Sequence, residues 1–105
     1  MLHNLKAQFE EASAKYAAAN GLKRDPDWFV LKMHEEIGEL TQIWNKLSGR
    51  GRRHGRSEAE LRQALADETA DLLGHILLFA GQNSLDLALA IERKWHFRPD
   101  EGTNS

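Results

Sequence analysis

The chain has 105 residues, of which 41% are hydrophobic and 29% charged, and its net charge is −2. This composition is typical of one globular domain and does not favour a nucleic-acid-binding or membrane-surface protein. The absence of cysteine excludes disulfides and thiolate metal sites, and it is compatible with the cytoplasmic location that we expect. No apolar run approaches the length of a membrane span.

Apolar residues recur with helical spacing in the first half of the chain, where strand signals are almost absent. A first helix is expected over residues 2–19, ended by Asn20 and Gly21. Asp25 and Pro26 then match an N-cap with proline at the first helical position. These signals predict a second helix over residues 26–47.

The second half of the chain predicts two more helices. Ser57 and Glu60 have the spacing of a capping box, which begins a third helix over residues 58–81. The later part of this helix is apolar on nearly all sides, which indicates burial against more than one neighbour. Ser84 is expected to cap a fourth helix over residues 85–95, and residues 100–105 to form a flexible tail. The prediction is an all-α, four-helix domain over residues 1–99.

Two acidic clusters lie beside or within the apolar stripes. The first contains Glu35, Glu36 and Glu39, and the second contains Glu68 and Asp71. Carboxylates three residues apart share one face of a helix. Two such helices packed together would gather like charges that cannot all stay ionised unless a cation holds them. The pattern predicts a site for a hard divalent cation, with Mg²⁺ as the first candidate.

The alternative is that these acids are solvated and form ion pairs, with Lys32 beside Glu35 and Glu36. The metal site is favoured because Glu36 and Glu68 both occupy core-facing positions of their helices. An unpaired carboxylate in such a position costs several kcal/mol or shifts its pKa.

The two acidic blocks also carry a family resemblance. Glu35-Glu36-Ile37-Gly38-Glu39 and Glu68-Thr69-Ala70-Asp71 resemble the signature of MazG-like nucleotide pyrophosphohydrolases, members of the all-α nucleoside triphosphate pyrophosphatase superfamily. The resemblance covers about residues 26–99 and includes the flanking segments 32–34 and 72–77. The gap between the blocks is long for the family, because it contains an arginine-rich loop at residues 50–56.

The resemblance implies a four-helix bundle that is completed by assembly into a homodimer or homotetramer. It implies Mg²⁺-dependent hydrolysis, with Mn²⁺ as a possible substitute, of the bond between the α and β phosphates of a nucleoside triphosphate. The products would be a nucleoside monophosphate and pyrophosphate, and the role would be cleaning of the nucleotide pool. The implied metal ligands are Glu36, Glu39, Glu68 and Asp71. Either Glu35 or Glu39 would accept the proton of the attacking water. The implied phosphate-binding cations are Lys32, Lys94 and Arg98.

Other features have weaker interpretations. His75 could be a metal ligand, but a hydrogen-bonded residue of the apolar core is favoured. Trp28, Trp44 and Trp95 are interpreted as core or dimer contacts in preference to base-stacking surfaces. The arginine-rich loop is equally compatible with a lid over phosphates and with a solvated, disordered connector.

Three other functional classes are less well supported by the sequence. A non-catalytic helical adaptor or oligomerisation protein, whose acids bind a structural ion, is the main alternative. A di-iron bundle is disfavoured because the chain has no Glu-x-x-His pair. Nucleic-acid binding is unlikely, since it rests on the arginine-rich loop alone.

Overall fold

The structure, a computed structural model, describes residues 1–99. Within this range it contains four helices and no strand: α1 (Leu2–Asn20), α2 (Pro26–Leu47), α3 (Glu58–Gln82) and α4 (Leu87–Trp95). The prediction of an all-α fold is therefore confirmed for this part of the chain. The expected tail at residues 100–105 lies outside the described residues. No single described helix is long and apolar enough to cross a membrane; α3 and α4 pass that test only as a pair bent by 109°.

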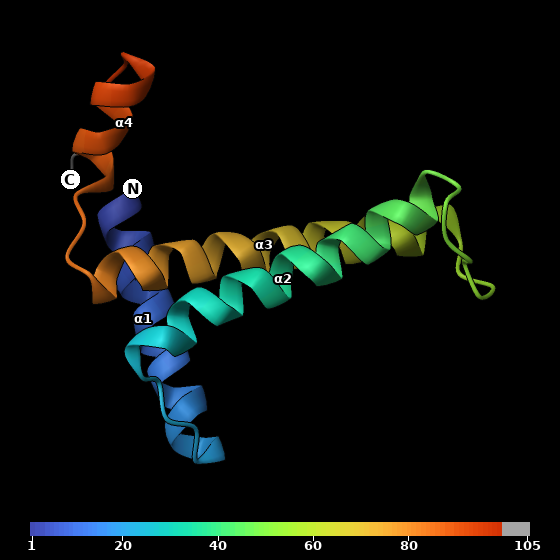
Figure 1. The fold of residues 1–105 in the computed structure, drawn as a ribbon, viewed down its shortest axis with the longest axis horizontal. Helices are drawn as coiled ribbons and strands as arrows, with labels where there is room; N and C mark the ends of the chain where they lie inside the picture. Colours follow the sequence, from blue (N-terminus) through green and yellow to red (C-terminus); the bar gives the residue numbers. More distant parts are fainter. Residues whose placement is uncertain (100–105) are drawn as a thin grey trace.

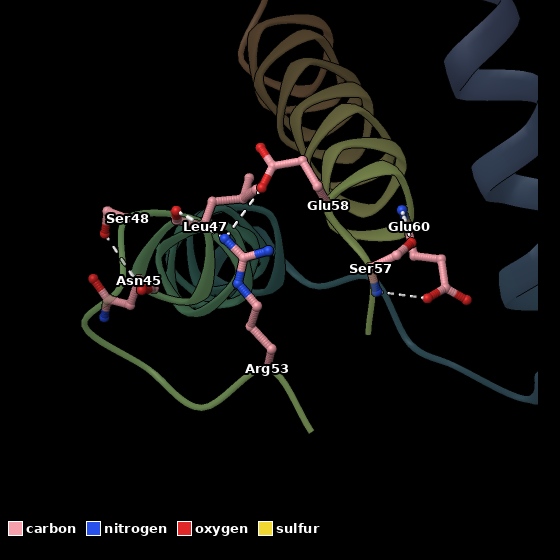
Figure 2. Close-up of polar contacts among 7 residues, drawn as sticks. All are labelled: Asn45, Leu47, Ser48, Arg53, Ser57, Glu58 and Glu60. Carbon is pink, nitrogen blue, oxygen red and sulfur yellow. Dashed lines mark hydrogen bonds and ion pairs between the residues drawn. The ribbon is translucent and has the colours of Figure 1, made fainter. Parts of the chain in front are cut away.

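Local capping signals set the starts of the two long helices. The Asp25 carboxylate accepts a hydrogen bond from the Trp28 backbone N–H at 2.9 Å, and Pro26 occupies the first turn of α2. At the start of α3, Ser57 and Glu60 form both bonds of a capping box, at 2.8 and 3.1 Å (Figure 2). Each bond satisfies a backbone or side-chain group within one helical turn, which is why the sequence alone predicted both starts.

The predicted start of the fourth helix is wrong. Ser84 has a φ of 54° and its N–H donates to the Gly81 carbonyl, so it belongs to the turn that ends α3. Asp86 caps α4 instead, and its carboxylate accepts from the Leu89 N–H at 3.0 Å. Aspartate caps a helix as well as serine does. The turn after α3 uses Ser84, and the cap therefore moves two residues along the chain.

Figure 1 shows α2 and α3 as a long antiparallel pair, with α1 crossing one end of it. The largest fully buried side chains are Phe29, Leu61 and Leu77. A Cβ atom on Gly74 would lie 2.7 Å from the Phe9 ring, so the glycine lets α1 approach α3 closely. In Figure 1, α4 rises from the end of α3 away from this pair, and none of its residues is buried.

One side of the α2–α3 pair carries exposed apolar residues, here called the apolar face: Val30, Ile37, Trp44, Leu73 and Ile76. The first three are seven residues apart along α2, and the last two are three apart along α3, so each set forms one stripe. By helical register, both stripes lie on the side of the pair opposite α1. The later part of α3 packs against both α2 and α1, as the sequence predicted, but its side at Leu73 and Ile76 is left uncovered within one chain.

Candidate metal centre and adjoining cavity

The antiparallel packing of α2 and α3 brings the two acidic clusters together near the middle of the pair. Glu36, Glu68 and Asp71 each have a carboxylate oxygen within 4.8 Å of the others. Glu35, Glu36 and Glu39 form a second group by the same criterion. Glu36 belongs to both groups, so the five carboxylates form one continuous cluster. Its ligand set is all oxygen, as hard cations such as Mg²⁺ require.

Two carboxylate oxygens of the cluster are withdrawn from water. Glu36 is only 5% exposed, and its Oε1 atom has no hydrogen-bond partner among the described residues. The Oε2 atom of Glu68 is likewise buried and unpartnered there. Buried polar atoms are nearly always paired because an unpaired one is costly. The side chains present therefore fit a bound cation, which would supply the missing partner.

The electrostatics of the cluster agree with this geometry. Burial raises the pKa of Glu36 above its ordinary value, and the charges of Glu39 and Asp71 raise it further. Burial is also the largest cause that raises the pKa of Glu68 to about 7, followed by a side-chain hydrogen bond with Glu39. The charges of Glu36 and Asp71 add to the increase for Glu68. A divalent cation would oppose these effects and keep both carboxylates ionised.

Lys32 is the cation at the edge of the cluster. Its Nζ atom lies 2.9 Å from Glu35 Oε1 and 4.0 Å from Glu36 Oε2. The hydrogen bond to Glu35 raises the pKa of Lys32, so the amine stays charged. The ion pair expected in the solvated alternative is thus present. It involves Glu35 and Glu36 and leaves the buried oxygen of Glu68 without a partner among the described residues.

The other two expected phosphate-binding cations lie away from the acidic cluster of their own chain. Lys94 is exposed near the end of α4, and Arg98 pairs with Glu92 at 3.1 Å. Both belong to the arm that rises away from the α2–α3 pair in Figure 1. The arginine-rich loop follows Leu47, which is about 16 Å along α2 from Glu36 at 1.5 Å per residue. Of the expected cations, the structure places only Lys32 at the acidic cluster.

The arginine-rich loop closes the far end of the α2–α3 pair. Arg53 pairs with Glu58 at 3.1 Å and donates to the Leu47 carbonyl at 3.3 Å, so it ties the two helix ends together (Figure 2). The chain reverses through left-handed conformations at Gly49, His54 and Gly55. The loop is thus a hydrogen-bonded turn, whereas the sequence left open a lid over phosphates and a solvated, disordered connector.

A cavity of about 550 Å³ adjoins the acids on the side where α1 crosses. Two cluster acids, Glu36 and Asp71, line it together with Lys32. The rest of the wall comes from all three long helices and the loop before α2: Phe9, Ala12, Ser13, Tyr16, Leu22, Trp28, Gly74, His75 and Leu78. The metal centre and the cavity therefore form one continuous site.

Arg24 holds the α1 wall of this cavity in place. Its guanidinium donates to Glu10 at 2.7 Å and to Ser13 Oγ at 3.1 Å, and it lies over the Phe29 ring at 5.4 Å. The bond to Glu10 raises the pKa of Arg24. Sequence reasoning missed Arg24, because its partners are on the preceding helix and become visible only once α1 and α2 are placed.

The expectation that His75 is a hydrogen-bonded core residue is wrong. Its Nδ1 atom is buried without a hydrogen-bond partner among the described residues, and its ring meets Trp28 edge to face at 5.8 Å. Burial lowers the pKa of His75, and the charge of Lys32 lowers it further. His75 belongs to neither carboxylate group. His75 lines the cavity together with the small α1 residues Ala12 and Ser13.

The three tryptophans differ in environment. Trp28 lines the cavity, whereas Trp44 and Trp95 are 48% and 73% exposed and lie outside it. Sequence reasoning also missed the α1 wall. Its only signal was a pair of small residues, Ala12 and Ser13, between two aromatic ones at helical spacing.

No protein-family model, curated protein or solved structure matches this chain.

Proposed function

We propose that this protein is a Mg²⁺-dependent nucleoside triphosphate pyrophosphohydrolase, which releases a nucleoside monophosphate and pyrophosphate. One observation carries the proposal: carboxylates from two helices converge while two of their oxygens are buried and unpartnered among the described residues. An adaptor that binds a structural ion has no need of a cavity beside it. Here the cluster opens onto about 550 Å³ of space, as an active site does. The MazG-like resemblance of the acidic blocks points to the same reaction.

The proposed role of each residue follows from its position in the site. Glu36, Glu68 and Asp71 would hold the metal, with Glu39 as a further ligand beside them. When bound, Mg²⁺ supplies positive charge to the phosphates and lowers the pKa of the attacking water. The proton of that water passes to Glu35 or Glu39, whichever is not committed to the metal. Lys32 brings positive charge to the edge of the cluster that faces the cavity.

The proposed enzyme functions as a homodimer or homotetramer. Support comes from the apolar face, where Ile37 is 48% and Leu73 is 43% exposed. A second copy packed on this face would bury both stripes and leave the cavity, on the opposite side, open. Lys94 and Arg98 do not lie beside the acids of their own chain, so a role in phosphate binding would require them to come from a neighbouring copy.

The test is the release of pyrophosphate and monophosphate from a panel of ribo- and deoxyribonucleoside triphosphates, with Mg²⁺ and with a chelator. Glu36→Gln and Asp71→Asn should abolish turnover without loss of helicity, whereas Asp67→Asn, one turn away and exposed, should keep it. Turnover that survives the chelator or either ligand variant would overturn the assignment. Metal binding without turnover on any nucleotide would favour the adaptor.

A further inference from the structure

We infer that the cavity between α1 and the α2–α3 pair binds the nucleobase of the substrate, with Trp28 as an aromatic wall and His75 as the residue that hydrogen-bonds the base edge. This inference rests on the proposed function, because it places the base of the nucleotide whose phosphates meet the acids. It goes beyond that function by naming which residues recognise the part of the substrate that does not react.

The shape of the cavity follows from four α1 residues. Phe9, Ala12, Ser13 and Tyr16 share one helix face, so two small side chains lie between two aromatic rings. On the facing helix, Gly74 has no side chain and the Phe9 ring packs directly against it. Aromatic rings and small residues therefore line the cavity together. Such a space suits a planar aromatic group, since ring faces stack well on one another.

His75 is a polar residue of the cavity wall whose ring has no hydrogen-bond partner among the described residues. Neither ring nitrogen of His75 hydrogen-bonds to a described residue, and only Nδ1 is closed off from solvent. A proton on Nδ1 would be an unpaired buried N–H, which is rarer in proteins than an under-satisfied acceptor. The proton therefore belongs on Nε2, the nitrogen that is not closed off from solvent, and His75 is part of the cavity wall. In this tautomer His75 presents a donor to an acceptor atom on the edge of a base.

The position of the cavity selects a nucleotide over other aromatic ligands. Glu36 and Asp71 belong to both the acidic cluster and the cavity wall, and Lys32, which also lines the cavity, lies at the edge of the cluster. A ligand that fills both has a polyanionic end at the metal centre and a planar aromatic end among the rings. A second cavity of about 520 Å³, between α1, the end of α3 and α4, contains none of the cluster acids.

The test uses Trp28 as a fluorescent reporter. The variant Trp44→Phe/Trp95→Phe leaves Trp28 as the only one of three tryptophans, and both replaced residues lie outside the cavity. The four ribonucleoside 5′-monophosphates are titrated with Mg²⁺ present, and quenching is followed. We expect saturable quenching by at least one of them. No quenching by any of the four would overturn the inference.

Two matched pairs of variants, made in this reporter background, locate the binding. Ala12→Leu fills the hollow and should weaken binding about tenfold or more, whereas Ala18→Leu, exposed on another side of the same helix, should not. His75→Leu should weaken binding about fivefold, and His75→Gln, which keeps a donor, should restore most of it. Equal effects within either pair would overturn the role assigned to that wall or donor.

The outcome can be separated from that of the proposed function. Monophosphate binding that follows this pattern, without pyrophosphate release from any triphosphate, would refute the enzyme and leave the base site standing. A different result would support the enzyme and refute the base site. In that case pyrophosphate is released, the KM of Ala12→Leu and of His75→Leu equals that of the wild type, and inorganic tripolyphosphate is cleaved as well as the nucleotide.

Discussion

Replacement of Glu68 by glutamine tests whether the acidic cluster is built for a cation. The substitution keeps the size of the side chain and removes a carboxyl group whose pKa is raised from 4.5 to about 7. At pH values between 4.5 and about 7, Glu68 is protonated in the folded, metal-free chain and ionised in the unfolded chain. The free energy of unfolding therefore falls as pH rises through this window, and the penalty is complete above pH 7.

The size of the effect follows from the same values. The difference between 4.5 and about 7 corresponds to about 3 kcal/mol. Glu68 is only partly buried, and solvent screening reduces this to about 1–2 kcal/mol. In a domain of this size, such a change shifts the unfolding temperature by roughly 5–10 °C.

The assay is thermal unfolding followed by circular dichroism at pH 5 and pH 8, with EDTA or with Mg²⁺. In EDTA at pH 8, Glu68→Gln should unfold above the wild type, and the difference should shrink at pH 5. With Mg²⁺ at ten times its dissociation constant, the wild type should gain about 1.4 kcal/mol and the variant much less. The exposed Asp67→Asn serves as the control. Equal stabilisation of both proteins by Mg²⁺, or a Glu68→Gln variant no more stable than wild type in EDTA at pH 8, would refute the reasoning.

Three further predictions concern packing, capping and assembly. Gly74→Ala should lower the free energy of unfolding by about 1–3 kcal/mol in chemical denaturation, because its Cβ would meet the Phe9 ring at 2.7 Å. Gly38→Ala, in open space on α2, should raise it by about 0.5–1 kcal/mol, and a loss there would contradict the packing described. Asp86→Ala should speed hydrogen exchange in α4 by removing a cap worth about 1 kcal/mol, whereas Ser84→Ala should leave it unchanged. Ile37→Glu on the apolar face should convert the proposed oligomer to a monomer in light scattering, and an unchanged mass would place the interface elsewhere.

The sequence predicted those features that depend on neighbours within one or two helical turns. The caps at Asp25 and Ser57 are of this kind, since each partner lies three residues away. The start of α4 was missed because Ser84 and Asp86 are both suitable caps. The choice between them depends on how α3 ends, which residue spacing does not specify.

The candidate site divides in the same way. Helical spacing and packing of two acidic faces were enough to predict that Glu36, Glu68 and Asp71 would meet, while their role as ligands stays a prediction. The cavity depends on where α1 crosses, which is set by the contact of Phe9 with Gly74. No local pattern encodes that crossing. The environment of His75 was therefore mispredicted, although its position one turn after Asp71 was known.

The location of the arginine-rich loop shows how this chain separates its two acidic blocks in sequence while it keeps them together in space. The loop joins α2 to α3 at the end of the hairpin, about 16 Å along α2 from Glu36, and Arg53 fastens its base. Residues can be added or removed there without changing how α2 lies against α3, since surface connections tolerate length changes well. Evolution could thus vary this connection while the acids stayed fixed. A search for distant relatives should hold the spacing constant within each helix and leave the separation between the helices free.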